Sequence, residues 1–237
     1  MADITLSVPD KNLTSPSSWG SRKSVASTMR KIVNNYGSYL KFASDNSKIP
    51  MEILASFIAV ESGGNATAGN EGHVTQGLMQ WNRDYASNTL SNEKKLGRLT
   101  ADEEAKLKEY GIKFDANNKT RAITNADQKK PELNILIGSI LLGQYADSYV
   151  NGKQDKELWG TDKNGNLRLD RIVACYNAGA YGTTGKLARF GNYATPSELA
   201  KAVNPVTRAY ISKIYGINGA MDVATSDVKD AFDKLKS

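Results

Sequence analysis

The sequence has very few of the residues that build disulfide frameworks and metal centres. Its 237 residues include one cysteine, Cys175, and one histidine, His73. One cysteine excludes an internal disulfide and a cysteine-rich metal site, and one histidine excludes a histidine-based metal cluster. Because Cys175 follows the apolar residues 172–174, we expect a buried structural thiol and not a nucleophile. We predict no metal site and no cofactor.

Long hydrophobic runs are also missing, and we predict no membrane span because none reaches the roughly 20 residues required. The first ten residues have neither the basic start nor the apolar run of a signal peptide, so we expect none. Lys and Arg exceed Asp and Glu by 31 to 25. This net charge of +6 suits an anionic surface such as nucleic acid, acidic lipid or bacterial wall polymer. No basic block is interleaved with aromatic residues, so we expect no nucleic-acid partner.

The sequence does have helical periodicity, whereas strand-like alternation is scarce. Segment 132–150 is apolar almost all round, which is typical of a central buried helix. Four other segments show apolar residues at helical spacing. They are residues 25–44, 50–61, 169–176 and 206–214. We therefore predict a mainly α fold.

Composition divides the chain into a central domain with two flanking segments. Residues 1–22 are rich in Ser, Thr, Asn and Pro, so we predict a flexible N-terminal arm. The domain then covers 23–217, with a polar segment at about 81–130 that resembles a long insertion. Thr100 to Glu103 in that segment is a capping-box pattern, which indicates a helix start. Residues 218–237 form a C-terminal tail, either a short amphipathic helix or a frayed end.

Glu61 is a candidate general acid because of its place in a helix. It shares an apolar face with Leu54 and Ile58, and Gly63-Gly64 follow as a helix stop. Partial burial and the negative end of the helix dipole both raise the pKa of a carboxyl group. A carboxyl group that stays protonated near neutral pH is what a general acid requires. The alternative is an exposed glutamate at a helix end.

Tyr176 repeats this arrangement at the end of another predicted helix. It lies on an apolar stripe just ahead of Gly179. Its hydroxyl is therefore placed to meet a buried partner such as a protonated carboxyl group. A plain core tyrosine is the alternative.

Five separated segments together resemble the soluble lytic transglycosylases and the related goose-type lysozymes. In chain order they are Glu61-Ser62-Gly63-Gly64, Gly77-Leu78-Met79-Gln80, Pro131-Glu132-Leu133-Asn134-Ile135 with Gly138, Tyr176-Asn177-Ala178-Gly179 and Thr207-Arg208-Ala209-Tyr210. The resemblance covers roughly residues 45–216. About fifty residues separate Gln80 from Asn134, more than family members usually have, and this length is expected to reshape the substrate groove.

The resemblance implies a lysozyme-like α-helical domain whose groove binds peptidoglycan glycan strands. Its reaction cleaves the β-1,4 bond between N-acetylmuramic acid and N-acetylglucosamine. Glu61 would protonate the glycosidic oxygen and then accept the proton of the C6 hydroxyl, which closes a 1,6-anhydro ring. No second carboxylate is needed, because the substrate supplies the nucleophile. By the same resemblance Ser62 would steady the glutamate, and Met79 and Gln80 would line the groove.

The resemblance also implies roles for residues later in the chain. Tyr176 would hydrogen-bond the Glu61 carboxyl group, and Asn177 would hold sugar or backbone. Tyr210 would close the far wall of the groove. Trp81, Tyr85 and Tyr181 are candidate stacking surfaces for sugar rings, with plain packing as the alternative for each.

Two other functions stay open at this point. One is a goose-type lysozyme hydrolase, in which Glu71, or Asp84 behind it, activates water. The other is a non-catalytic peptidoglycan-binding or structural virion protein. With neither a signal peptide nor a wall-binding repeat, we expect a bacteriophage virion-associated protein that acts on the bacterial cell wall. Other virion proteins would contact it through the N-terminal arm.

Overall fold

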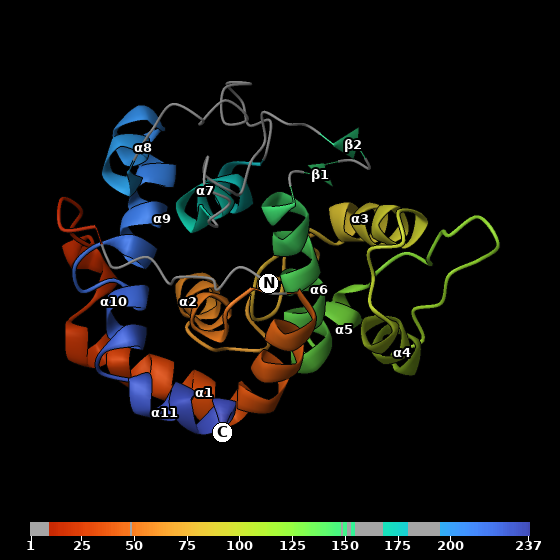
Figure 1. Cartoon of the computed structure of the whole chain (residues 1–237), viewed down its shortest axis with the longest axis horizontal. Helices are drawn as coiled ribbons and strands as arrows, with labels where there is room; N and C mark the ends of the chain where they lie inside the picture. The colour runs from red at the N-terminus through yellow and green to blue at the C-terminus, as the bar shows by residue number, and fades with distance from the viewer. Residues whose placement is uncertain (1–9, 48, 148, 151–152, 155–167, 180–194) are drawn as a thin grey trace. The chain divides into compact units, whose positions relative to one another are not determined.

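Helices provide most of the regular structure of the computed structural model, so the predicted mainly α fold is confirmed (Figure 1). The structure describes residues 10–47, 49–147, 149–150, 153–154, 168–179 and 195–237. The elements are η1 (Ser17–Trp19), α1 (Arg22–Ser47), α2 (Met51–Ser62), α3 (Arg83–Lys95), α4 (Ala101–Glu109), α5 (Asn125–Gln128), α6 (Pro131–Ala146), β1 (Tyr149–Val150), β2 (Lys153–Gln154), α7 (Leu169–Ala178), α8 (Pro196–Ala202), α9 (Pro205–Tyr215), α10 (Ala220–Thr225) and α11 (Lys229–Lys236).

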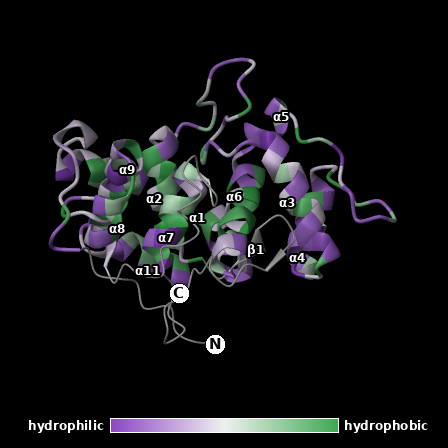
Figure 2. Ribbon diagram, turned by 90° about the horizontal axis from the view of Figure 1, so that it is seen from above, coloured by the Kyte–Doolittle hydropathy of each residue, from purple (hydrophilic) through white to green (hydrophobic). Residues whose placement is uncertain are grey.

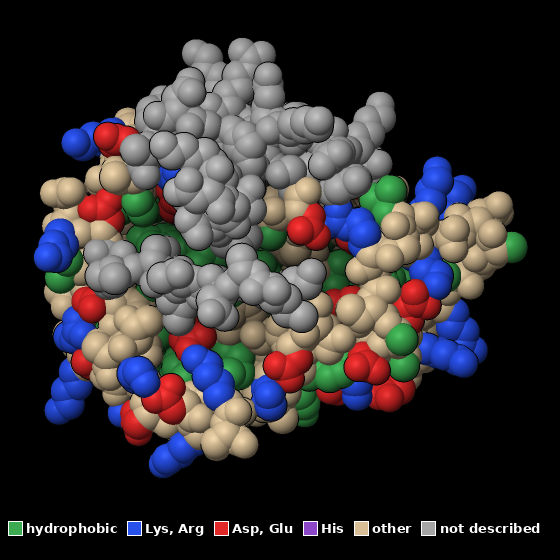
Figure 3. All heavy atoms as spheres, in the orientation of Figure 1, with side chains coloured by type: hydrophobic (Ala, Val, Ile, Leu, Met, Phe, Trp, Pro, Cys, Tyr) green, Lys and Arg blue, Asp and Glu red, His purple; other side chains and the backbone are tan. Residues whose placement is uncertain are grey.

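The chain divides into two units that we describe separately. The central unit is Ile32–Gly143, and the terminal unit is Met1–Lys31 with Gln144–Ser237. In the described residues no helix is long and apolar enough to cross a membrane. On the face drawn in Figure 3, Lys and Arg side chains are interspersed with Asp and Glu.

The core of the central unit is built on α2 and α6. Nine of the twelve residues of α2 are buried, and α6 is buried from Leu133 to Leu142. Figure 2 shows the hydrophobic colour along α6 and the hydrophilic colour over α4. The sequence pattern predicted a helix as far as Val150, but α6 ends at Ala146. The difference arises because Tyr149–Val150 pairs with Lys153–Gln154 as a two-stranded antiparallel sheet.

The polar segment 81–130 contains α3, α4 and α5, and polar contacts cap and join these helices. The capping box predicted at the start of α4 is present, with Thr100 Oγ1 accepting from the Glu103 N–H and the Glu103 carboxylate accepting from the Thr100 N–H. An ion pair of 2.6 Å joins Lys94 of α3 to Glu104 of α4. Local capping and ion pairs therefore join the helices of this segment, which also buries apolar side chains such as Leu90 and Leu107.

The terminal unit is built around α9, which packs against α7, α8 and α10. Part of the predicted N-terminal arm lies against the end of α9 in this unit. The Asp10 N–H donates to the Tyr215 carbonyl and the Ser15 N–H to the Ile217 carbonyl, each at 3.1 Å. Leu13 between them is buried. These contacts join residues about 200 positions apart in the chain, so no local pattern indicates them.

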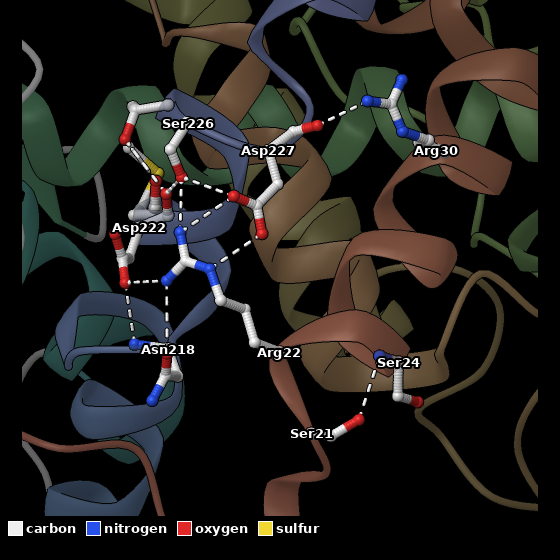
Figure 4. A network of polar contacts seen from close by, with 10 residues as sticks. Ser21, Arg22, Ser24, Arg30, Asn218, Asp222, Ser226 and Asp227 are labelled. Atoms are coloured by element: carbon white, nitrogen blue, oxygen red, sulfur yellow. Dashed lines mark hydrogen bonds and ion pairs between the residues drawn. The ribbon is translucent and has the colours of Figure 1, made fainter.

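The C-terminal tail forms α10 and α11, and Arg22 ties it to the start of α1 (Figure 4). The Arg22 guanidinium donates to Asp222 at 2.6 Å and to Asp227 at 2.8 Å. Hydrogen bonds from Arg22 lower the pKa of the Asp227 carboxyl group. Val228 and Phe232 are fully buried, so the tail contributes apolar residues to the core of the terminal unit.

Candidate active site

The C-terminal end of α2 positions Glu61. Residues Met51–Ala59 are buried, and the half-buried Glu61 follows in the last turn. The helix stops because Gly63 adopts a left-handed conformation (φ 61°), from which its N–H donates to the Ala59 carbonyl at 3.2 Å. The predicted placement is therefore confirmed, and Glu61 is not an exposed glutamate at a helix end. The negative end of the helix dipole opposes its ionised form.

The residues after Glu61 are fixed by hydrogen bonds to the backbone. Ser62 Oγ donates to the Ile58 carbonyl at 3.1 Å and accepts from the Gly64 N–H at 3.2 Å. The Tyr36 hydroxyl, from α1, donates to the Gly64 carbonyl at 3.1 Å. Ser62 thus stabilises the helix end that carries Glu61. Tyr36 was not among the residues predicted for the site.

Asn134 of α6 holds the segment Gly77–Gln80. Its side-chain oxygen accepts from the Met79 N–H at 2.8 Å, and its amide nitrogen donates to the Gln76 carbonyl at 3.2 Å. Its own carbonyl accepts from the Trp81 indole N–H at 2.9 Å. Asn134 is completely buried, and each of these bonds compensates the desolvation of a polar group. Two sequence segments of the predicted site are therefore joined.

Two glycines allow the segment to approach α6 closely. A Cβ atom at Gly77 would lie 2.1 Å from the Gln128 carbonyl oxygen, and one at Gly138 would lie 2.3 Å from the Met79 sulfur. Only glycine fits at position 77, where the contact is with backbone, whereas a larger residue at position 138 would displace the end of the Met79 side chain. The Met79 side chain is fully buried at Gly138, so it belongs to the core of the central unit. Its role in the groove stays a prediction.

Gln80 has a strained backbone. Its φ of 51° lies in the left-handed region, which residues other than glycine rarely adopt. Its side-chain amide donates to the carbonyls of Ala68 at 3.1 Å and Gly77 at 2.8 Å. Strain of this kind persists where the surrounding structure imposes it, and it is concentrated at ligand sites.

The terminal unit carries the other predicted site residues. Tyr176 and Asn177 are half-buried in the last turn of α7. The Thr207 hydroxyl, from the first turn of α9, donates to the Asn177 side-chain oxygen at 2.9 Å. Tyr210, one turn later, is buried. Burial raises the pKa of the Cys175 thiol to about 12, as expected for a structural cysteine.

The acids proposed for the hydrolase are in a different environment. Glu71 is exposed in the loop after α2, and Asp84 is exposed in the first turn of α3, 3.7 Å from Arg83. Of the three candidate stacking residues, Trp81 is buried and bonded to Asn134, so it is a packing residue. Tyr85 is half-buried, and Tyr181 lies outside the described residues. No group of three or more potential metal-ligating side chains occurs among the described residues.

Comparison with protein families identifies the class of protein. Residues 38–196 match the model of the transglycosylase SLT domain, which is more than half of the chain. The chain therefore belongs to the transglycosylase SLT domain family, and its helical fold is the lysozyme-like fold of that family. This membership supports a lytic transglycosylase type of activity on peptidoglycan. A comparison with curated proteins gives no match.

Proposed function

We propose that the protein is a lytic transglycosylase that cleaves the N-acetylmuramic acid–β-1,4–N-acetylglucosamine bond and leaves 1,6-anhydro ends, with Glu61 as its general acid and base. The observation that carries the proposal is the position of Glu61. It is half-buried in the last turn of α2, within residues 38–196, which match the transglycosylase SLT domain.

The proposed reaction needs one carboxyl group. Glu61 gives its proton to the glycosidic oxygen as the bond from that oxygen to C1 breaks. The resulting carboxylate accepts the proton of the C6 hydroxyl while O6 bonds to C1 and closes the anhydro ring. Glu61 is protonated again at the end, and no water is consumed. The helix dipole, which opposes the ionised form of Glu61, favours the protonated carboxyl group with which the reaction starts.

The substrate-binding residues of the proposal are those that the family resemblance indicates. They are Ser62, Met79, Gln80, Tyr176, Asn177 and Tyr210. Support comes from the strained backbone of Gln80 and from the bond between Thr207 and Asn177, since both hold candidate residues in defined positions. The virion setting and the contact made by the N-terminal arm stay predictions.

The substitution Glu61→Gln tests the assignment of the acid. The amide has the same shape but can neither give nor take the proton. We expect clearing of a peptidoglycan suspension to slow by about 100-fold or more, with unchanged circular dichroism. Glu71→Gln, which changes an exposed glutamate ten residues away, is the matched control and should keep activity within about twofold. A folded Glu61→Gln protein with substantial activity would contradict the proposal. An inactive, folded Glu71→Gln protein would favour the hydrolase.

A further inference from the structure

Gln128, the last residue of α5, reaches the loop formed by residues 74–81. It is completely buried, and its side-chain amide lies 3.0 Å from the Val74 carbonyl and 2.7 Å from the Trp81 carbonyl. Carbonyl oxygens only accept hydrogen bonds, so the contacting atom is the amide nitrogen. One side chain from the polar segment 81–130 therefore holds both ends of the loop that contains Met79 and Gln80.

Gln128 also contacts the middle of this loop through its backbone. Its carbonyl accepts from the Asn134 side-chain amide at 2.8 Å. The same carbonyl lies where a Cβ atom of residue 77 would be, which restricts that position to Gly77. The side chain and the backbone of Gln128 thus act on the same few residues.

The side chain of Gln128 is used only as a donor among the described residues. Its amide nitrogen makes two bonds, whereas its side-chain oxygen is buried with no hydrogen-bond partner in the described part of the chain. A buried acceptor without a partner costs free energy. Gln128 therefore departs from the rule that buried polar atoms are hydrogen-bonded. Such a residue is easier to explain by the conformation that it imposes on the loop than by a gain in stability.

Short helix α5 is itself firmly anchored. Thr124 and Asp127 form a capping box, and Asp127 pairs with Arg121 at 2.7 Å and with Lys130 at 3.1 Å. Burial alone would raise the pKa of Asp127, but hydrogen bonds from Arg121 and Thr124 lower it well below its usual range. The carboxylate therefore stays ionised, and the end of α5 that carries Gln128 is fixed.

The residue next to the strained Gln80 is the one that Gln128 holds. Trp81 is held at its carbonyl by Gln128 and at its indole by Asn134. With the position after it fixed in this way, Gln80 cannot relax from its φ of 51° without breaking buried hydrogen bonds. Removing the donors of Gln128 frees the Trp81 carbonyl and lets Gln80 move toward an ordinary conformation.

We propose that Gln128 is a positioning residue for substrate binding, which holds the 74–81 loop in the conformation with which Gln80 meets the glycan. This inference rests on the proposed function. It gives the segment 81–130 a role in the reaction, although Gln128 touches neither the substrate nor the reacting atoms. Its loss should weaken binding of the glycan more than it slows the chemical step.

The test compares variants at position 128 with a control in the same segment. Gln128→Met keeps the length of the side chain but removes its hydrogen-bond donors. Gln128→Glu keeps the shape of the side chain but replaces the donors with acceptors. Thr100→Ala removes the cap of α4 and should reduce stability without affecting the 74–81 loop. KM and kcat are measured on soluble glycan fragments. Binding of an N-acetylglucosamine hexasaccharide is measured by calorimetry with each variant combined with Glu61→Gln.

We expect both variants at position 128 to raise KM by about tenfold and to weaken hexasaccharide binding equally, with kcat within about threefold of wild type. Thr100→Ala should leave KM and binding unchanged. If Gln128→Met loses stability as Thr100→Ala does but binds the hexasaccharide normally, Gln128 has only a structural role and the inference is wrong. A fall in kcat without a rise in KM would also overturn the inference. Gln128→Glu decides the matter if Gln128→Met does not fold. If the Glu61→Gln protein is active, the assignment of Glu61 as the acid is wrong. The inference on Gln128 is still decided separately, by the KM values of the variants at position 128.

Discussion

The central unit and the terminal unit each hold the candidate residues that they carry by different means. In the central unit, Asn134 and Gln128 join the 74–81 loop to α6 and α5 through completely buried hydrogen bonds. In the terminal unit, the hydroxyl of Thr207 joins the start of α9 to Asn177 at the end of α7 through a half-buried bond. Both helices that carry the main candidates, α2 and α7, are buried over most of their length and end at a glycine.

This difference indicates where a substitution should be most damaging. Removing one partner of a buried hydrogen bond leaves the other group with no hydrogen-bond partner in either protein or water. A half-buried group can bond to solvent instead. The central unit should therefore lose stability when its polar residues change. The terminal unit should respond mainly in activity.

Asn134→Ala should have the largest effect on stability. It deprives the Met79 N–H and the carbonyls of Gln76 and Gln128 of their bonds to the side chain. We expect the free energy of unfolding to fall by about 3 to 5 kcal/mol. The measurement is urea unfolding, with Asn88→Ala on the exposed face of α3 as control. A loss no larger than that of the control would show that the buried bonds do not fix the loop.

Tyr176→Phe tests the terminal unit through activity. If the hydroxyl takes part in the reaction, its removal should lower kcat by roughly 10 to 1000-fold. The free energy of unfolding should change by only about 1 kcal/mol, because the substitution removes a single hydroxyl from a half-buried side chain. Unchanged turnover together with a large loss of stability would make Tyr176 a plain core tyrosine.

Thr207→Val should have the smallest effect. Valine has the shape of threonine but cannot donate to Asn177, so we expect a loss of about 1 kcal/mol in unfolding free energy. Thr207→Ser keeps the hydroxyl but removes the methyl group, so it separates the effect of the hydrogen bond from the effect of methyl packing. If Thr207→Val were as destabilising as Asn134→Ala, the contrast between the two units would not hold.

The features of the site that depend on local sequence were predictable. Glu61 was found from an apolar stripe followed by two glycines, and the structure places it as that pattern indicated. The cap at Thr100 was recognised in the same way. Such signals work because helix ends are determined by a few adjacent residues.

The features that depend on distant contacts were not predictable. Gln128 lies 54 residues from Val74 and 47 from Trp81, in a polar segment with no pattern to single it out. Tyr36 bonds to Gly64 across 28 residues. For Trp81 the sequence leaves stacking and plain packing open, since its indole partner lies on α6. Only the folded chain brings these groups together.

Mass spectrometry of the fragments that the wild-type protein releases from peptidoglycan tests the central claim most directly. Closure of the ring by the C6 hydroxyl makes each new end lighter by one water than a hydrolytic end. We predict that the new ends are 1,6-anhydro-N-acetylmuramic acid. Release of reducing ends instead would contradict the transglycosylase mechanism and assign the protein to the hydrolases.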